Sequence, residues 1–209
     1  MNRGLLTRRV IKPLVFVGLL VPAALLVRDA FTGNLSANPI EDITHRLGWW
    51  GLTILLATLA VTPLRRVTGW SQLISLRRMV GLAAFCYLSL HFLTYVVLDQ
   101  FFSVRDIVDD VANRPYITVG FASYALLVPL AVTSTKKMVR RLGGKRWVRL
   151  HRLVYVAAAG GVLHFLWLVK ADARDPTIFG VVLVALLGFR IWMRRERQGR
   201  ASVSAEASG

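Results

Sequence analysis

Long apolar runs alternate with short polar segments along almost the whole chain. Each run approaches the ~20 residues that an α-helix needs to cross the hydrocarbon core of a bilayer. The pattern predicts an all-α, polytopic membrane helix bundle with six transmembrane helices, over residues 11–27, 47–64, 79–98, 116–133, 148–169 and 177–193. We assign residues 1–195 to one membrane domain and expect the polar cytoplasmic tail 196–209 to be disordered.

Composition agrees with a membrane protein. Hydrophobic residues make up 55% of the chain, against roughly 45–50% in soluble domains, and the mean hydropathy is +0.53. The single cysteine, Cys86, falls inside the third predicted span. One thiol excludes a disulfide framework, a zinc site built from cysteines and an iron–sulfur cluster, and we expect Cys86 to be a small core residue.

The net charge of +16 would suggest a nucleic-acid partner in a soluble protein. Here the basic residues gather in alternate loops. The N-terminal segment, residues 65–78, residues 136–152 and the C-terminal end hold 21 of the 27, whereas nine of the eleven acids lie on the other side. Because basic residues concentrate on the cytoplasmic side of membranes, we predict cytoplasmic termini, a lipid bilayer around the chain and no nucleic-acid partner.

The pair Arg8-Arg9 before the first apolar run has a second interpretation. A twin-arginine export signal has the same arrangement of basic and apolar residues. Five further spans need no signal for soluble export, and membrane orientation already explains both arginines. We therefore interpret this segment as the first transmembrane helix.

Two histidines fall inside predicted spans, where an imidazole is costly unless it pairs with or ligates something. His91 lies seven residues before the end of the third span, and His164 lies five before the end of the fifth. Both spans run outward, so a rise of 1.5 Å per residue places both imidazoles roughly 8–11 Å below the outer end of the hydrocarbon layer. His151 lies roughly 20 Å lower, near the cytoplasmic rim.

Two imidazoles at matched depth on separate helices can clamp a planar, apolar cofactor, and haem suits this arrangement. Filling both axial positions favours electron transfer over oxygen chemistry. Small residues nearby would either let a flat macrocycle approach the backbone or let helices pack closely; they are Ala157–Gly161, Gly81, Ala83 and Ala84. His45, in the loop before the second span, is interpreted as a solvated or capping residue.

Two other functions are compatible with intramembrane histidines: a histidine-based metal or proton transporter, and a membrane anchor without a redox role. Proton-coupled transporters usually carry an acid within a span, and no Asp or Glu lies inside the six predicted spans. Transporter sites also use paired helices broken by Gly or Pro, which the pattern does not contain. The haem interpretation is therefore preferred.

Three parts of the chain resemble one known family: Arg77–Leu82 with Ser89–Tyr95, Arg114–Phe121 with Ala131–Thr135, and Arg146–Tyr155. Over residues 10–195 the chain resembles the MsrQ (YedZ) family of haem-binding membrane subunits, which belongs to the wider ferric-reductase-like transmembrane group. The resemblance implies a b-type cytochrome of the bacterial inner membrane, with FMN as a second cofactor. It makes His91, His151 and His164 candidate iron ligands.

The same resemblance implies a function. Such a subunit passes electrons across the membrane to a periplasmic molybdopterin-containing partner, MsrP, which reduces methionine sulfoxide in oxidised proteins. We expect the chain itself to carry electrons without substrate catalysis of its own. No flavin–nicotinamide domain follows the last predicted span, so we expect a quinol or a separate flavin reductase as the electron donor.

One position departs from the wider group. Members with two stacked haems carry two histidines on each ligand helix, but Arg77 stands 14 residues before His91. A guanidinium stays charged and is a poor iron ligand. His151 would therefore need an unusual partner to hold an inner haem, or would serve a flavin or quinone. In either case Arg77 and Arg78 would pair with phosphate or propionate groups.

Overall fold

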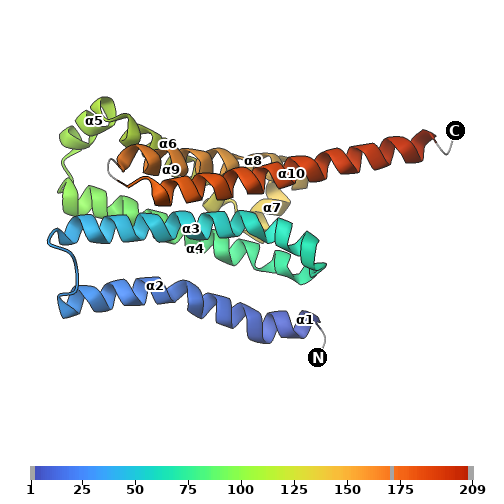
Figure 1. Ribbon diagram of the computed structural model, residues 1–209, viewed down its shortest axis with the longest axis horizontal. Helices are drawn as coiled ribbons and strands as arrows, with labels where there is room; N and C mark the ends of the chain where they lie inside the picture. The colour runs from blue at the N-terminus through green and yellow to red at the C-terminus, as the bar shows by residue number, and fades with distance from the viewer. Residues whose placement is uncertain (1–2, 170–171, 207–209) are drawn as a thin grey trace.

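The computed structural model describes residues 3–169 and 172–206, and every regular element within them is helical (Figure 1). Among the described residues, six helical segments are long and apolar enough to cross a membrane: Gly4–Thr32, Pro39–Thr68, Ser71–Asp99, Pro115–Val132, Gly144–Leu168 and Arg174–Met193. Each overlaps one predicted span, so the all-α bundle with six spans is confirmed. The first described residues and the end of the last helix lie at the same end of the bundle (Figure 1).

The element order begins with α1 (Arg3–Leu6), the π-helical turn η1 (Thr7–Ile11), α2 (Lys12–Thr32), α3 (Pro39–Thr68), the 3₁₀ turn η2 (Ser71–Ser75) and α4 (Arg77–Thr94). It continues with the π-helical turn η3 (Tyr95–Asp99), α5 (Val104–Asn113), α6 (Pro115–Val132), α7 (Lys136–Leu142), α8 (Gly144–Leu150), α9 (Leu153–Leu168) and α10 (Arg174–Glu206). The short helix α5 lies at the end of the bundle opposite the termini (Figure 1).

Local sequence explains where several helices begin and end. Asn38, Ser103 and Thr135 precede α3, α5 and α7, and each side chain accepts a hydrogen bond from the backbone N–H three residues later. Such caps satisfy N–H groups that have no partner inside the helix. Gly33 and Gly69 end α2 and α3 with φ of 72° and 66°, a left-handed conformation that glycine adopts without steric cost.

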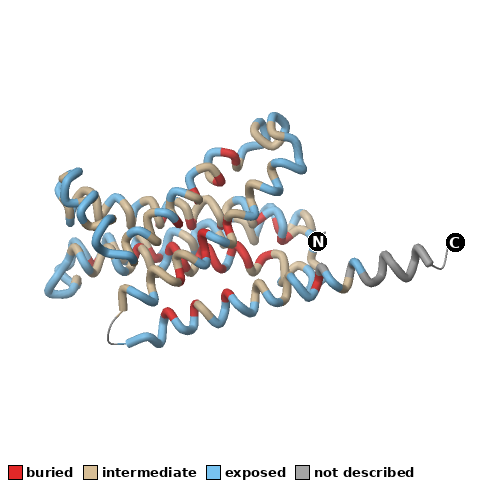
Figure 2. Tube along the Cα trace, turned by 90° about the horizontal axis from the view of Figure 1, so that it is seen from above, coloured by how far each residue is buried: buried red, intermediate tan, exposed pale blue. Residues whose placement is uncertain are grey.

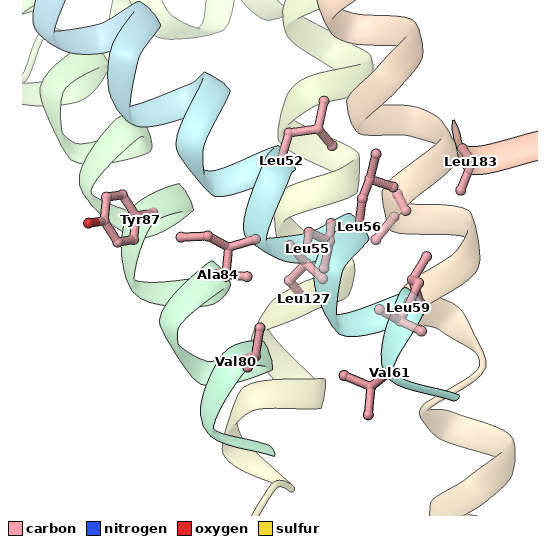
Figure 3. Close-up of a cluster of buried hydrophobic side chains, with 14 of the residues drawn as sticks. Leu52, Leu55, Leu56, Leu59, Val61, Val80, Ala84, Tyr87, Leu127 and Leu183 are labelled. Atoms are coloured by element: carbon pink, nitrogen blue, oxygen red, sulfur yellow. The ribbon is translucent and has the colours of Figure 1, made fainter. Parts of the chain in front are cut away.

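The centre of the bundle is built around α3. Leu55 and Leu59 of this helix are buried together with Ala84 of α4, Leu127 of α6 and Leu183 of α10 (Figure 3). Buried residues accordingly concentrate along the middle of the bundle (Figure 2). This packing holds α4, α6 and α9 around α3, and these four helices carry the site described below.

Small residues let α6 and α9 approach closely. Ala157 and Ala158 of α9 are buried, and a Cβ added at Gly160 would lie 2.1 Å from the Oγ of Ser123 on α6. For these three α9 residues, the structure supports close helix packing rather than contact with a flat cofactor.

The helix α2 packs loosely, and a tyrosine of α4 joins it to the bundle. Pro22 has no N–H and interrupts the backbone hydrogen bonding of α2. One residue further on, the Tyr87 hydroxyl accepts a hydrogen bond from the Ala23 N–H at 3.0 Å and donates one to the Leu19 carbonyl at 2.7 Å. The hydroxyl thus stands in the place of a helical Ala23–Leu19 hydrogen bond.

An arginine of α10 donates a hydrogen bond to a backbone carbonyl that a second proline leaves without its helical partner. Pro63 of α3 cannot donate to the carbonyl four residues earlier, which belongs to Leu59. Arg190 of α10 donates to this carbonyl from Nη2 at 2.8 Å, donates to the Tyr155 hydroxyl, and lies 5.0 Å from the centroid of the Tyr155 ring. Arg190 lies inside the sixth predicted span, and the structure gives it contacts to α3 and α9.

Two details of the spans differ from the sequence-based expectations. The fifth span is interrupted, because α8 ends at Leu150 and α9 begins at Leu153, with a turn at His151 and Arg152. The first span extends to Thr32 and so includes Asp29, whose buried carboxylate pairs with Arg46 at 2.8 Å. A hydropathy window averages over both features and detects neither.

The segment that we expect to be a disordered tail, residues 196–209, is described only in part. Over residues 196–206 the structure continues α10 as a helix, and residues 207–209 lie outside the described part. This segment contains no proline to stop a helix.

Candidate functional site

The two intramembrane histidines meet across the bundle. His91 projects from α4 and His164 from α9, and their ring centroids lie 6.2 Å apart with an angle of 75° between the ring planes. Both side chains are half-buried. The sequence placed these residues at the same depth on separate helices, and the structure brings their rings together.

Backbone carbonyls fix the tautomer of both rings. The Nδ1 of His91 lies 2.8 Å from the carbonyl oxygen of Thr44 on α3. The Nδ1 of His164 lies 2.7 Å from the carbonyl oxygen of Tyr116 on α6. Because a carbonyl oxygen only accepts, Nδ1 carries the proton in each ring and Nε2 keeps its lone pair. This is how proteins usually orient a metal-binding histidine.

Two glycines make room for the rings. A Cβ added at Gly48 of α3 would lie 3.0 Å from the Cε1 and Nδ1 of His91. A Cβ added at Gly120 of α6 would lie 2.7 Å from the Nδ1 of His164. Atoms in contact normally stand about 3.5–4.0 Å apart, so a side chain at position 120 would displace the imidazole of His164, and one at position 48 would crowd the imidazole of His91.

The separation of the rings fits one shared metal ion. A histidine nitrogen binds a transition metal at about 2.0–2.1 Å, so two imidazoles on opposite sides of one ion have centroids roughly 6 Å apart. Within residues 3–169 and 172–206, no group of three or more His, Cys, Asp or Glu side chains could hold a metal. Haem needs only two protein ligands, because the porphyrin supplies the other four nitrogens.

Aromatic side chains pack between α4 and α6, and one of them contacts His164. Phe92, next to His91, packs edge-on against Phe121 with ring centroids 5.0 Å apart and stacks on Tyr124 at 4.7 Å. Tyr116 lies 6.1 Å from His164, ring centre to ring centre. Aromatic rings of this kind would suit the apolar body of a porphyrin.

His151 belongs to a separate group at the junction of α8 and α9. Its Nε2 lies 3.1 Å from the Thr133 hydroxyl, and its ring stacks on Trp147 with centroids 3.9 Å apart. The indole Nε1 of Trp147 donates to the Thr133 carbonyl at 2.9 Å. Arg77, at the start of α4, is half-buried, whereas Arg78 is exposed.

The structure also places the two remaining candidate residues, His45 and Cys86. His45 is exposed on α3, as a solvated residue would be. The expectation that Cys86 is a core residue is wrong, because this side chain is exposed. The buried face of α4 is formed by Val80, Ala84 and Tyr87, at helical spacing, and Cys86 lies on another face.

Sequence reasoning missed the supports of the histidines. The carbonyls of Thr44 and Tyr116 leave no trace in a sequence, because every residue carries a carbonyl. The one available signal was spacing, since a glycine follows each of them four residues later, at Gly48 and Gly120.

Comparisons with known proteins find a family and relatives for this chain. A family described as "Ferric reductase like transmembrane component" matches residues 47–162, more than half of the chain. That range holds His91, His151 and both glycines, and it ends two residues before His164. A protein of Rhodospirillum rubrum named "Protein-methionine-sulfoxide reductase heme-binding subunit MsrQ" is 55% identical over 189 residues, which are 90% of this chain and 91% of that protein.

The chain belongs to the MsrQ family. Another member, from Herminiimonas arsenicoxydans, is 50% identical over 192 residues, covering 90% of this chain and 88% of the relative. A third, from Azospira oryzae, is 48% identical over 190 residues, covering 90% and 82%. The names of these MsrQ relatives describe a heme-binding subunit of a protein-methionine-sulfoxide reductase. No solved structure matches the chain.

Proposed function

We propose that the chain is a haem b-containing electron-transfer subunit, with His91 and His164 as the two axial ligands of one haem. The observation that carries this proposal is the histidine pair itself: 6.2 Å between ring centroids, with both Nδ1 atoms at backbone carbonyls. The names of the relatives support the same cofactor. A haem held there would supply a one-electron carrier.

The protein's own contribution is to hold the two imidazoles. The carbonyls of Thr44 and Tyr116 keep the proton on Nδ1, which would leave Nε2 of each ring to bind the iron. Two nitrogen ligands leave no axial position for a substrate, which suits electron transfer without substrate catalysis by the chain. A metal or proton transporter on these histidines is the alternative, and no observed contact favours it.

A second cofactor site is proposed at the other histidine. His151 and Trp147 stack on each other with ring centroids 3.9 Å apart, so only an outer aromatic face of this pair is left for a further ring. Arg77 and Arg78 lie at the start of α4. A flavin such as FMN would stack on the aromatic face and place its phosphate against the arginines. An inner haem on His151 would instead require the imidazole to leave Thr133.

The proposed path runs across the bacterial inner membrane. The excess of basic residues at the end that holds the termini supports a cytoplasmic orientation for that end. Electrons would enter from a quinol or a flavin reductase and leave near the His91–His164 pair. The acceptor would be a periplasmic molybdopterin reductase, MsrP, that repairs oxidised proteins; the relatives' names describe them as subunits of a protein-methionine-sulfoxide reductase.

An absorbance spectrum of the purified protein tests this function. Protein produced with adequate haem supply should show a Soret band that shifts on reduction, together with the visible bands of a low-spin b-type haem. A colourless preparation that is folded and monodisperse would refute the proposal. Flavin is tested separately, by the fluorescence of FMN released on denaturation, with His151→Ala as the comparison.

A further inference from the structure

The same local arrangement occurs twice, on two different helices. On α3, the carbonyl of Thr44 faces the Nδ1 of His91, and Gly48 lies against the same ring. On α6, the carbonyl of Tyr116 faces the Nδ1 of His164, and Gly120 lies against that ring. In both cases the glycine follows the carbonyl residue by four positions, which is about one helical turn.

The two parts of this arrangement constrain different motions of the ring. The carbonyl holds Nδ1 at 2.7–2.8 Å and so fixes one point of the imidazole. The glycine lets the ring lie directly on the helix surface, where residues four apart are neighbours. With a Cβ present, the ring would have to tilt or withdraw from the carbonyl.

We propose that Gly48 and Gly120 are positioning residues for the axial ligands. Each glycine, with the carbonyl one turn before it, sets the plane and the protonated nitrogen of one imidazole. Together the two glycine–carbonyl pairs hold the imidazole planes of His91 and His164 at 75° to each other. The inference rests on the proposed haem, because only a shared iron makes the angle between the two planes an electronic property of the cofactor.

The angle has a measurable consequence. Nearly perpendicular imidazole planes give low-spin ferric haem a strongly anisotropic EPR signal, whereas parallel planes give a more compact one. Substituting Gly48 or Gly120 should turn one imidazole, and so move the lowest-field EPR feature and the midpoint potential of the haem. Loss of a group that orients a metal-binding histidine typically lowers metal affinity about 10–100-fold. We expect a loss of haem affinity of about 10-fold for Gly120→Ala, and a smaller one for Gly48→Ala, where the contact is looser.

The chain offers matched controls for packing damage. Gly51 lies on α3 one turn from Gly48, and a Cβ there would meet Leu88 at 2.6 Å rather than a histidine. Gly160 lies on the helix of His164, and a Cβ there would meet Ser123. Gly51→Ala and Gly160→Ala therefore crowd the same helices without touching either imidazole.

EPR spectra and redox titrations of the full-length haem protein decide the matter. The proposal predicts shifted signals and potentials in Gly48→Ala and Gly120→Ala, with wild-type values in Gly51→Ala and Gly160→Ala. If Gly120→Ala does not accumulate, Gly48→Ala alone is decisive. Unchanged spectra in Gly48→Ala, or equal changes in Gly51→Ala, would overturn the proposal. Its failure is distinct from failure of the proposed function, which would appear as wild-type protein without haem.

Discussion

The imidazole planes of His91 and His164 stand at 75° to each other across a centroid separation of 6.2 Å. Neither ring is free to turn, because each Nδ1 faces a backbone carbonyl and each ring lies against a glycine. A pair that only packed together would not require the same support twice. The arrangement is what a protein needs to hold two axial ligands before the cofactor arrives.

Removing the guanidinium of Arg190 should destabilise the fold. Arg190→Met leaves the Leu59 carbonyl without the partner that replaces the missing Pro63 N–H. An unsatisfied buried polar group costs about 1–3 kcal/mol, and a lower midpoint of thermal unfolding in detergent would report it. Arg195→Met on the exposed surface of the same helix is the control and should leave the midpoint unchanged. Equal midpoints in both variants would contradict the role given to Arg190.

The stabilising effect of the Tyr87 hydrogen bonds to α2 should depend on Pro22. Tyr87→Phe removes the hydroxyl that bonds both Ala23 and Leu19, at an expected cost of about 1–2 kcal/mol. In a Pro22→Ala background, α2 can close its own hydrogen bonds, so the same change should cost less. The free energies of unfolding of the four proteins in this double-mutant cycle measure the coupling. Strictly additive changes would argue against the role given to the Tyr87 hydroxyl.

Sequence reasoning reached the spans and the histidine pair because both depend on long-range averages. Hydropathy over about 20 residues identifies a span, and the helical rise then fixes the depth of His91 and His164. It failed where a single backbone atom decides the structure. Three features are of this kind. They are the carbonyls that accept hydrogen bonds from the histidines, the turn at His151, and the hydrogen bond from Arg190 to the Leu59 carbonyl.

The sequence-based prediction also missed a buried charge near the end of a span. Asp29 stood just beyond the predicted first span, so the span looked free of acids. In the structure, Asp29 is buried beside Arg46. The pairing joins α2 to α3, and hydropathy averaging cannot anticipate it because the partner lies on another helix.

The inner histidine should be separable from the outer pair. His151 lies at the α8–α9 junction with Thr133 and Trp147, so His151→Ala should leave the signal of the His91–His164 haem in place. Optical and EPR spectra compared with those of wild type and His164→Ala measure this. Disappearance of the same signal in both histidine variants would show that one cofactor depends on both residues.

The central claim is that His91 and His164 ligate one haem, and haem content per polypeptide tests it most directly. His91→Ala and His164→Ala should each lose the low-spin spectrum assigned to the pair, whereas His45→Ala, which alters an exposed histidine of α3, should keep it. The measurement is a reduced-minus-oxidised spectrum with haem quantified on folded, monodisperse protein. A wild-type spectrum and haem ratio in His164→Ala would contradict the account.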